Sequence, residues 1–441
     1  MKIFKYPDRK DWNQILARPL TDSSSLDETV KRVLIDVKEK GDIAIRNFTA
    51  QFDKADVTDL RIGDKEIHEA ENLVSDDLKQ AIVTAKENIE KFHRAQLKTQ
   101  EFVETMPGIQ CWRKDLPIER VGLYIPGGTA PLFSTVLMLG IPANLAGCKQ
   151  IILCSPPDTA GKLNPAILFA AKLVGVTKIF RVGGVQAIAA MTYGSESIPK
   201  VYKIFGPGNQ YVTRAKQLVQ KDGVAIDLPA GPTEVAIFAD ETAHPAFVAA
   251  DLLSQAEHGV DSQVVFVTHN QLLIDEVIMQ LDKQVVDLPR QNIVVKALEH
   301  GKMILVKNEK EAIDLLNEYG AEHLVLACSS ADDLAEQIMN AGSVFLGNYS
   351  TESVGDYASG TNHTLPTNGY AKAYSGVSVD SFMKKVTFQK ITESGLKSIA
   401  RTVELMAEAE GFFAHKNSVS IRLQATGKKS HTEEAAAKKL P

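Results

Sequence analysis

EVAIFADETAHPAFVAADLLSQAEHGVDSQVVFVT, residues 234–268, has the pattern of a strand, a helix and a second strand in immediate succession. Both ends of this segment are short apolar runs bounded by turn formers, which is typical of strands buried on both faces. Between them, Pro245 suits the first turn of a helix and Gly259 suits its end. The segment therefore predicts a helix that crosses between two buried strands.

The same alternation continues on both sides of this segment. Further apolar runs that predict strands lie between helical patterns at residues 150–157, 178–184, 203–209, 224–229, 292–297, 303–308, 323–328 and 343–348. Strands that alternate with helices indicate a mainly parallel sheet covered by helices on both faces. We therefore expect an α/β fold of two adjacent doubly wound units, which is followed beyond Asp380 by helices.

Composition restricts the class of protein. The 441 residues carry a formal net charge of -6, which argues against a general nucleic-acid binder. No apolar run is long enough to span a membrane, and MKIFKYPDRKDW is too polar for a secretory signal. The four cysteines form no CxxC pair. We expect reduced thiols in a cytoplasmic protein.

Gln255 and His258 are three residues apart in the predicted helix 250–259, so both side chains leave the same face. An amide oxygen and an imidazole nitrogen in this arrangement could begin a zinc site. The alternative is that His258 caps the last carbonyl groups of the helix. This segment alone does not decide between the two interpretations.

Three turns in the upstream unit are rich in glycine: YIPGG at 124–128, RVGGVQA at 181–187 and IFGPGN at 204–209. Ligands of doubly wound sheets lie beyond the carboxyl ends of strands, where these turns are predicted. No turn matches GxGxxG with an acidic residue about twenty positions later. Ordinary βα turns also contain glycine, but three in one unit favour a ligand, such as a nucleotide bound in a non-standard way.

Glu322 and His323 are two adjacent proton-transfer groups at the edge of a predicted buried strand. Such a pair suits general acid/base catalysis, although a loop could equally satisfy both groups structurally.

The segment 350–367 is long, polar and rich in turn formers, which is often a functional feature. It contains Asp356, a plausible oxygen ligand, and His363, which could be a ligand or a surface residue. Near the end of the chain, Glu410 and His415 flank a Gly-Phe-Phe bend and could complete a site. With Gln255 and His258, these nitrogen and oxygen donors would suit zinc.

A thiolate nucleophile is the alternative for an aldehyde oxidation. Cys154 ends an apolar strand and Cys111 adjoins Trp112 in another strand, so both cysteines fit a structural role. Neither has a neighbouring base in the sequence. We expect no thiol route.

Several longer motifs together resemble the histidinol dehydrogenase family. These motifs are VGLYIPGGTAPLFSTVLML at 121–139, FGPGNQYV at 205–212, LPAGPTEV at 228–235, SQAEHG at 254–259, AEHL at 321–324 and VGDYASGTNHTLPT at 354–367. The resemblance extends from about residue 25 to about residue 425, in the order of the family.

The resemblance implies two successive NAD-dependent oxidations, from L-histidinol through L-histidinaldehyde to L-histidine, with one zinc ion per subunit. It implies that the catalytic pair is Glu322 and His323. The implied zinc ligands are Gln255, His258, Asp356 and His415, and the implied NAD contacts are Tyr124, Gln186 and Asn209. The implied substrate contacts are Thr233, Gln255, His258, His323, Asp356, Glu410 and His415. At position 233 the family commonly has serine, and threonine keeps the hydroxyl group.

The resemblance also implies a homodimer of intertwined subunits, in which the C-terminal segment reaches the partner's site. The implied α/β domains are two incomplete Rossmann-like domains, the second inserted in the first. We expect a helical arm at 1–24, a first domain at 25–123 and 235–378, an inserted NAD-side domain at 124–234, a helical segment at 379–428 and a disordered tail at 429–441.

Three alternatives remain open at this stage. A zinc hydrolase would use similar ligands and an adjacent glutamate to activate water. A related NAD-dependent dehydrogenase would oxidise another amino or sulfonated alcohol. A non-catalytic binding protein could keep the same fold.

Overall fold

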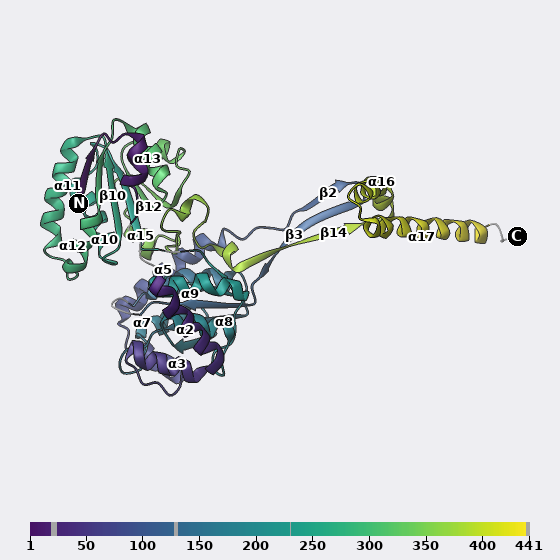
Figure 1. Cartoon of the computed structure of the whole chain (residues 1–441), viewed down its shortest axis with the longest axis horizontal. Coiled ribbons are helices and arrows are strands. Elements are labelled where there is room, and N and C mark those ends of the chain that lie inside the picture. The colour runs from purple at the N-terminus through teal and green to yellow at the C-terminus, as the bar shows by residue number, and fades with distance from the viewer. Residues whose placement is uncertain (19–23, 128–130, 230, 438–441) are drawn as a thin grey trace. The chain divides into compact units, whose positions relative to one another are not determined.

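The structure is a computed structural model that describes residues 1–18, 24–127, 131–229 and 231–437 (Figure 1). The chain divides into two compact units, which are made of Met1–Leu97 with Pro117–Phe382 and of Lys98–Leu116 with Met383–Pro441. The larger unit contains two parallel sheets flanked by helices, which confirms the predicted α/β architecture. Within the described residues, no helix combines the length and the apolar character needed to cross a membrane.

The first sheet has six parallel strands in the order β1-β11-β10-β9-β12-β13. Their bounds are β1 Lys2–Lys5, β9 Glu234–Ala239, β10 Gln263–Thr268, β11 Lys302–Leu305, β12 Ala321–Ala327 and β13 Ala341–Leu346. From β9 the chain winds outward through β10 to β11, and it then returns to β12 on the other side of β9. The strand order therefore reverses between β9 and β12.

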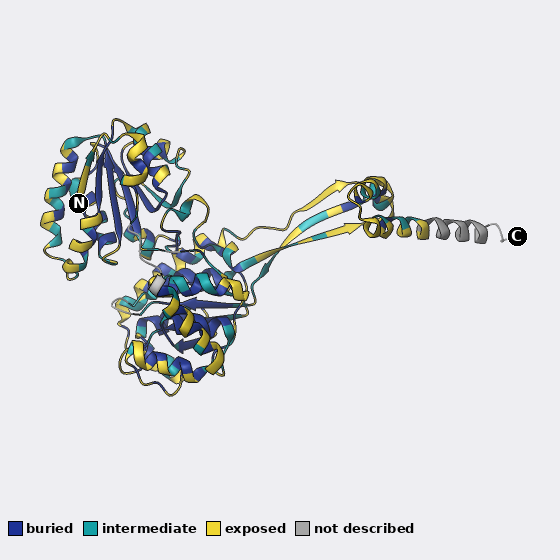
Figure 2. Ribbon diagram, viewed as in Figure 1, coloured by how far each residue is buried: buried dark blue, intermediate teal, exposed yellow. Residues whose placement is uncertain are grey.

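Helices cover both faces of this sheet because alternate side chains of a strand point to opposite faces. Val235 and Ile237 of β9 share a core with α10, α11 and α12, whereas Ala236 and Phe238 share one with α1, α13 and α14. The bounds of these helices are α1 Trp12–Ile15, α10 Pro245–Ala256, α11 Gln271–Val285, α12 Gln291–His300, α13 Glu309–Tyr319 and α14 Ala331–Ala335. Figure 2 shows the central strands of the sheet as almost entirely buried.

The second sheet has five parallel strands in the order β6-β5-β4-β7-β8. Their bounds are β4 Arg120–Tyr124, β5 Gln150–Ser155, β6 Lys178–Arg181, β7 Lys203–Phe205 and β8 Ala225–Ile226. The helices of this part are α2 Ser24–Lys40, α3 Asp42–Phe48, α4 Asp64–Glu71, α5 Asp76–Arg94, α6 Phe133–Leu145, α7 Pro165–Leu173, α8 Gly184–Tyr193 and α9 Gln210–Val219. The strand order again reverses in the middle, between β4 and β7.

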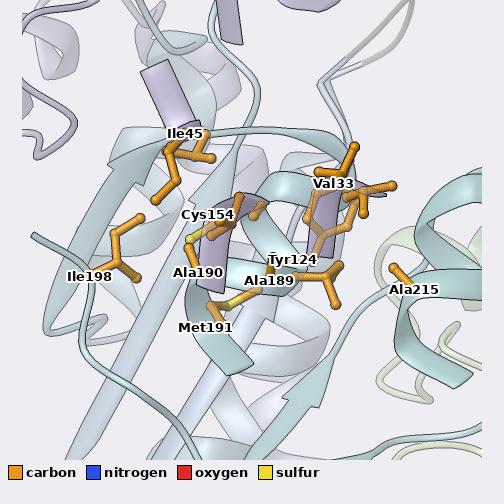
Figure 3. Close-up of a cluster of buried hydrophobic side chains, with 14 of the residues drawn as sticks. Val33, Ile45, Tyr124, Cys154, Ala189, Ala190, Met191, Ile198 and Ala215 are labelled. Carbon is orange, nitrogen blue, oxygen red and sulfur yellow. The ribbon is translucent and has the colours of Figure 1, made fainter. Parts of the chain in front are cut away.

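Helices α2 and α3 pack into the core of this second sheet. Val33 and Ile45 lie in one buried cluster with Cys154, Ala189 and Ile198 (Figure 3). We expected residues 25–123 to belong with 235–378, but these helices bury their apolar faces against the part of the chain that follows Arg120. An amphipathic helix shows that one of its faces is apolar, but not which sheet that face covers.

The first residues of the chain also differ from the expected helical arm at 1–24. The structure begins with strand β1, which pairs with β11 at the edge of the first sheet. A 3-10 helix, Arg9–Asp11, and the short helix α1 follow, and the predicted arm between 19 and 23 lies outside the described residues. A four-residue KIFK segment is too short for its periodicity to show a strand. Residues 292–297, which we expected to form a strand, belong to helix α12.

The smaller unit contains a three-stranded sheet and two helices. Strands β2 and β3 pair antiparallel, and β14 lies on the other side of β3. The bounds are β2 Phe102–Met106, β3 Ile109–Pro117, β14 Met383–Ile391, α16 Glu393–Ala409 and α17 Phe413–Ala437. Trp112 holds this sheet together through ring contacts with Phe102 and Phe388, whose centroids are 5.3 and 5.6 Å away.

The helices predicted beyond Asp380 are confirmed by α16 and α17, but the segment 379–428 also contains the long strand β14. The tail that we expected to be disordered is helical as far as Ala437, since the last third of α17 is rich in alanine, glutamate and lysine. The remaining expected tail, 438–441, lies outside the described residues, as do residue 230 and residues 128–130, which include the last glycine of the turn predicted at 124–128.

Candidate active site

Glu322 and His323 lie at the amino-terminal start of β12, beside the start of β9. Helix α13 ends at Gly320, whose left-handed backbone (φ 63°) turns the chain directly into the strand. Both side chains are buried. The candidate catalytic pair of the first sheet is therefore at the amino ends of its strands, whereas the glycine-rich turns follow the carboxyl ends of strands in the second sheet.

The Glu322 carboxylate is held by groups at the start of β9. Thr233 Oγ1 donates a hydrogen bond to Glu322 Oε2 at 2.6 Å, and the Glu234 backbone N–H donates to the same oxygen at 2.9 Å. Burial raises the pKa of Glu322, and nearby His323 and these hydrogen bonds lower it, so that the pKa is about 7. A carboxylate with a near-neutral pKa is suited to accept and release protons.

The His323 ring lies between two acceptors. Its Nε2 is 3.2 Å from Asp356 Oδ1, and its Nδ1 is 3.3 Å from the Glu234 carbonyl oxygen. Burial lowers the pKa of His323, but the carboxylates of Glu322, Asp356 and Glu352 outweigh burial and raise this pKa to about 10. The contacts of the two ring nitrogens fix the orientation of the ring beside Glu322, whose Oε2 lies 3.6 Å from His323 Nδ1.

Gln255 reaches the same place from the last turn of α10 and is fully buried. With its amide nitrogen directed at Glu352, Gln255 donates to Glu352 Oε1 at 2.7 Å, and its oxygen accepts from the Glu234 backbone N–H at 3.1 Å. Helix α10 ends at Ala256, so His258 lies in the following turn rather than on the helix face that we predicted. Burial lowers the pKa of His258, which favours the neutral imidazole that a metal ligand requires.

Asp356 is carried by the short helix α15, Glu352–Tyr357. His363 fixes that helix end, because its Nδ1 is 2.8 Å from the Asp356 carbonyl oxygen and its Nε2 is 2.9 Å from Thr135 Oγ1. Both ring nitrogens of His363 are thus used in the fold. Burial raises the pKa of Asp356, but the imidazoles of His323, His363 and His258 hold this pKa below its ordinary value.

The structure therefore brings Gln255, His258 and Asp356 to one end of the first sheet. Glu410 and His415 belong to the smaller unit, where Glu410 directly follows α16 and His415 lies in the first turn of α17. Among the described residues, no three His, Cys, Asp or Glu side chains of one chain are grouped to hold a metal ion. The amide, imidazole and carboxylate donors fit a zinc ion in chemical type but form only part of a ligand set.

The three predicted NAD contacts line one large cavity of about 2860 Å³, together with Thr233 and His258. The Gly184 N–H donates to Tyr124 Oη at 3.2 Å. Gln186 Nε2 donates to Asp53 Oδ2 at 3.3 Å, and its buried Oε1 has no hydrogen-bond partner within the described part of the chain. Asn209 caps α9 by accepting from two backbone N–H groups at 3.1 Å, which orients the turn before the helix.

The two cysteines considered as nucleophiles lie in a core and in a strand of the smaller unit. Cys154 is fully buried in the core of the second sheet, and burial raises the pKa of its thiol. Cys111 belongs to strand β3 of the smaller unit. The structural interpretation of Cys154 is therefore confirmed.

Two buried acids of this site were missed in the sequence. Glu352 accepts from Ser254 Oγ at 2.8 Å, and burial raises its pKa to about 8. Glu234 places its backbone against both members of the catalytic pair. One pattern could have drawn attention to Glu234, which is the acidic residue of LPAGPTEV and lies directly before an apolar run. Buried strands rarely begin with an unpaired charge.

Comparison with known proteins shows the family of the chain. The family model described as histidinol dehydrogenase matches residues 16–423. A histidinol dehydrogenase of Bacteroides fragilis is 59% identical over 424 residues, which cover 96% of this chain and 99% of the relative. One from Salmonella typhimurium is 49% identical over 426 residues, 94% of this chain and 97% of the relative. The crystal structure of histidinol dehydrogenase from Elizabethkingia anophelis is 54% identical, superposes with a TM-score of 0.95, and the match covers 97% of this chain and 99% of that one. The chain belongs to the histidinol dehydrogenase family.

Proposed function

We propose that this chain oxidises L-histidinol to L-histidine through L-histidinaldehyde and transfers one hydride to NAD in each of two steps. The observation that carries the proposal is the buried Glu322–His323 pair, held by Thr233, Glu234 and Asp356 at one end of the first sheet. Family membership supplies the substrate class, and the cavity that reaches Thr233 supplies room for substrate and cofactor.

Gln255, His258 and Asp356, with the partner's His415, would hold a zinc ion. The chemistry that zinc would supply is to bind the imidazole and amino nitrogens of histidinol and to present its alcohol carbon to the nicotinamide. This assignment requires the homodimer in which the C-terminal segment of one subunit completes the site of the other. Glu410 would join the substrate contacts from the same segment.

In the first oxidation His323 accepts the proton of the substrate hydroxyl while the hydride of the alcohol carbon passes to NAD. This step requires the neutral ring, which a zinc ion on Asp356 would favour, because it would offset part of the carboxylate charge that raises the pKa of His323. The products are the aldehyde, NADH and one proton. The Glu234 carbonyl group, 3.3 Å from Nδ1, holds the imidazole in place for this transfer, and Nε2 would be the nitrogen that accepts the proton.

In the second oxidation Glu322 accepts a proton from water as the water oxygen attacks the aldehyde carbon. The resulting hydrate loses its hydride to a second NAD, and His323 accepts the hydroxyl proton to give the acid. The cofactor would contact Tyr124, Gln186 and Asn209 in the glycine-rich turns of the second sheet. Each sheet contains the first five positions of the doubly wound strand order, so each would be an incomplete Rossmann-like domain. We place the reaction in the cytoplasm, as the cysteine pattern predicts.

The test is the yield of NADH from limiting L-histidinol, before and after removal of divalent metal by a chelator. We expect two NADH per histidinol, loss of activity on chelation, and recovery when zinc is added. Absence of NADH with release of a hydrolysis product would indicate a zinc hydrolase. Rapid NADH formation only with a different amino or sulfonated alcohol would replace histidinol as the substrate.

A further inference from the structure

Arg18 forms a partly buried cluster with Glu234 of β9 and Tyr319 of α13, at the same end of the first sheet as the candidate catalytic pair. Its guanidinium donates to both oxygens of Glu234, from Nε at 2.6 Å and from Nη2 at 2.8 Å. The side chain of Glu234 is only 1% exposed. A planar, two-pronged contact of this kind fixes both partners more closely than a single hydrogen bond.

The same guanidinium also contacts the residue that precedes the turn into β12. Nη2 donates to the Tyr319 carbonyl oxygen at 2.9 Å, and the guanidinium carbon lies 4.1 Å from the centre of the Tyr319 ring. Tyr319 Oη donates to Glu234 Oε2 at 3.2 Å. One arginine therefore connects the start of β9 to the chain that enters β12.

The backbone of Glu234 contacts both members of the catalytic pair. Its N–H donates to Glu322 Oε2 at 2.9 Å, and its carbonyl oxygen is 3.3 Å from His323 Nδ1. A rotation of the Glu234 backbone would thus displace two groups together: the N–H that donates to Glu322 and the carbonyl oxygen that lies beside His323. The Arg18–Glu234 contact opposes such a rotation because it holds the side chain of the same residue.

The segment that carries Arg18 is itself anchored to the first sheet. Lys302 Nζ of β11 donates to the Ala17 carbonyl oxygen at 3.2 Å. Trp12 and Leu16 of the same segment are buried in the core beneath α13. The guanidinium is therefore presented from a fixed backbone and not from a free arm.

We propose that Arg18 is a positioning residue for the oxidation, which clamps the starts of β9 and β12 through Glu234 and Tyr319 and so holds Glu322 and His323 in their reactive geometry. This proposal rests on the proposed function. Arg18 touches neither member of the pair, and its effect passes through Glu234.

The test compares Arg18→Ala and Arg18→Lys with Arg214→Ala in the full-length chain. Arg214 is a control for the loss of a two-pronged contact, because it makes one with Asp27, at 2.5 and 2.7 Å, but it joins α9 to α2. It also lines the proposed NAD cavity, so its replacement is compared at saturating NAD and is expected to change KM for NAD rather than kcat. Displacing a catalytic group by about 1 Å costs roughly 100-fold in rate. We expect kcat for histidinol oxidation to fall about 100-fold in Arg18→Ala and less in Arg18→Lys, with KM for NAD within about twofold of wild type.

Two further measurements separate positioning from a loss of folding. Added guanidinium ion, below denaturing concentration, should restore kcat in Arg18→Ala and have no effect on Arg214→Ala. Amide hydrogen exchange at Glu234 should accelerate in Arg18→Ala, whether or not the substrate has been assigned correctly.

The outcomes are decisive in each case. A wild-type kcat in Arg18→Ala with faster exchange at Glu234, or an equal loss of kcat in Arg214→Ala, would overturn the proposal. If Arg18→Ala does not fold, the same criteria apply to Arg18→Lys, in which the charge remains and the planar contact is lost. A wild-type chain that oxidises no histidinol would instead refute the proposed function, and the exchange measurement would still report on the clamp.

Discussion

The ionisable side chains with shifted pKa values that matter most in this protein fall into two groups. Glu322, Glu352 and His323 are buried close to one another, so their charges are set by mutual contacts as much as by solvent. Asp53 and Asp42 lie away from that cluster, in the part of the chain that packs on the second sheet. The first group bears on the reaction, and the second bears on the pH dependence of folding.

Replacement of Glu322 by Gln should separate the two oxidations. The amide cannot accept a proton from water, so we expect the aldehyde step to slow by about 100- to 10,000-fold, while His323 still serves the alcohol step. The NADH yield from limiting histidinol, measured over a few turnovers, should fall from two to one. The rate of the first NADH is the internal control, and a yield of two at the wild-type rate would contradict the role of Glu322.

Asp53 should make the folded state less stable as the pH rises. Burial raises its pKa from 3.8 to about 6, so the stabilisation that its protonated form gives is present below pH 4 and is lost between about pH 4 and pH 6. Asp53→Asn cannot ionise. In urea unfolding we expect the variant to gain about 1–3 kcal/mol relative to wild type between pH 4.5 and pH 7.5.

Asp42→Asn is the matched control with the opposite sign. Burial raises the pKa of Asp42, but hydrogen bonds from Ser195 and Ser197 and the charge of Arg46 hold it below its ordinary value. Asp42 therefore contributes stability at neutral pH that is lost in acid. Asp42→Asn should lose stability relative to wild type as the pH rises through the acid range to about 4 and should change little above it. Equal signs of the pH-dependent change in the two variants would refute this explanation.

Individual elements were predicted well where their periodicity is long and less well where it is short. Three neighbouring elements were predicted correctly: EVAIFAD forms β9, the helix that contains Gln255 is α10, and SQVVFVT forms β10. NIVVKA became part of α12 because a short apolar run fits a buried helix as well as a strand. The catalytic residues Glu322 and His323 could be proposed from motifs, but their contacts with Thr233 and Glu234 could not, since those depend on which strands become neighbours.

The turn between β7 and α9 gives a prediction at this scale. Gly206 has a φ of 122°, and a Cβ there would lie 2.0 Å from the Tyr124 carbonyl oxygen. Gly206→Ala should therefore displace the turn that carries Asn209. We expect a higher KM for NAD and a loss of about 2–4 kcal/mol in the free energy of unfolding.

Gly223→Ala is the control for backbone strain. Gly223 also has a positive φ, 84°, but a Cβ there would meet no atom within 4 Å. It should cost about 1 kcal/mol, from strain alone, and leave KM for NAD unchanged. Equal effects of the two substitutions in urea unfolding and in kinetics would show that the contact with Tyr124 is unimportant.

At the scale of the whole molecule, the residues proposed for the site come from both units of the chain. Gln255, His258 and Asp356 belong to the larger unit, and Glu410 and His415 to the smaller one. The sequence indicated both groups through motifs. The packing of α2 and α3 was not predictable, because it depends on contacts between segments that are far apart in the chain.

Subunit complementation tests the proposed homodimer. His258→Ala and His415→Ala chains should each be inactive alone, because each lacks one proposed zinc ligand. After the two are unfolded and refolded together, half of the dimers should be mixed, and each mixed dimer should have one intact site. We expect about one quarter of the wild-type activity. If the mixture remains inactive while each variant binds its partner, His415 does not act across the dimer.

The pairing of β1 with β11 sets the order in which the protein can form during synthesis. Lys2 lies beside Lys302, so the edge strand must wait for 300 further residues before its neighbour has left the ribosome. The second sheet is built from the contiguous stretch between β4 and β8 and has no such wait. The nascent chain should therefore complete its second sheet first, while strand β1 remains unpaired and within reach of chaperones.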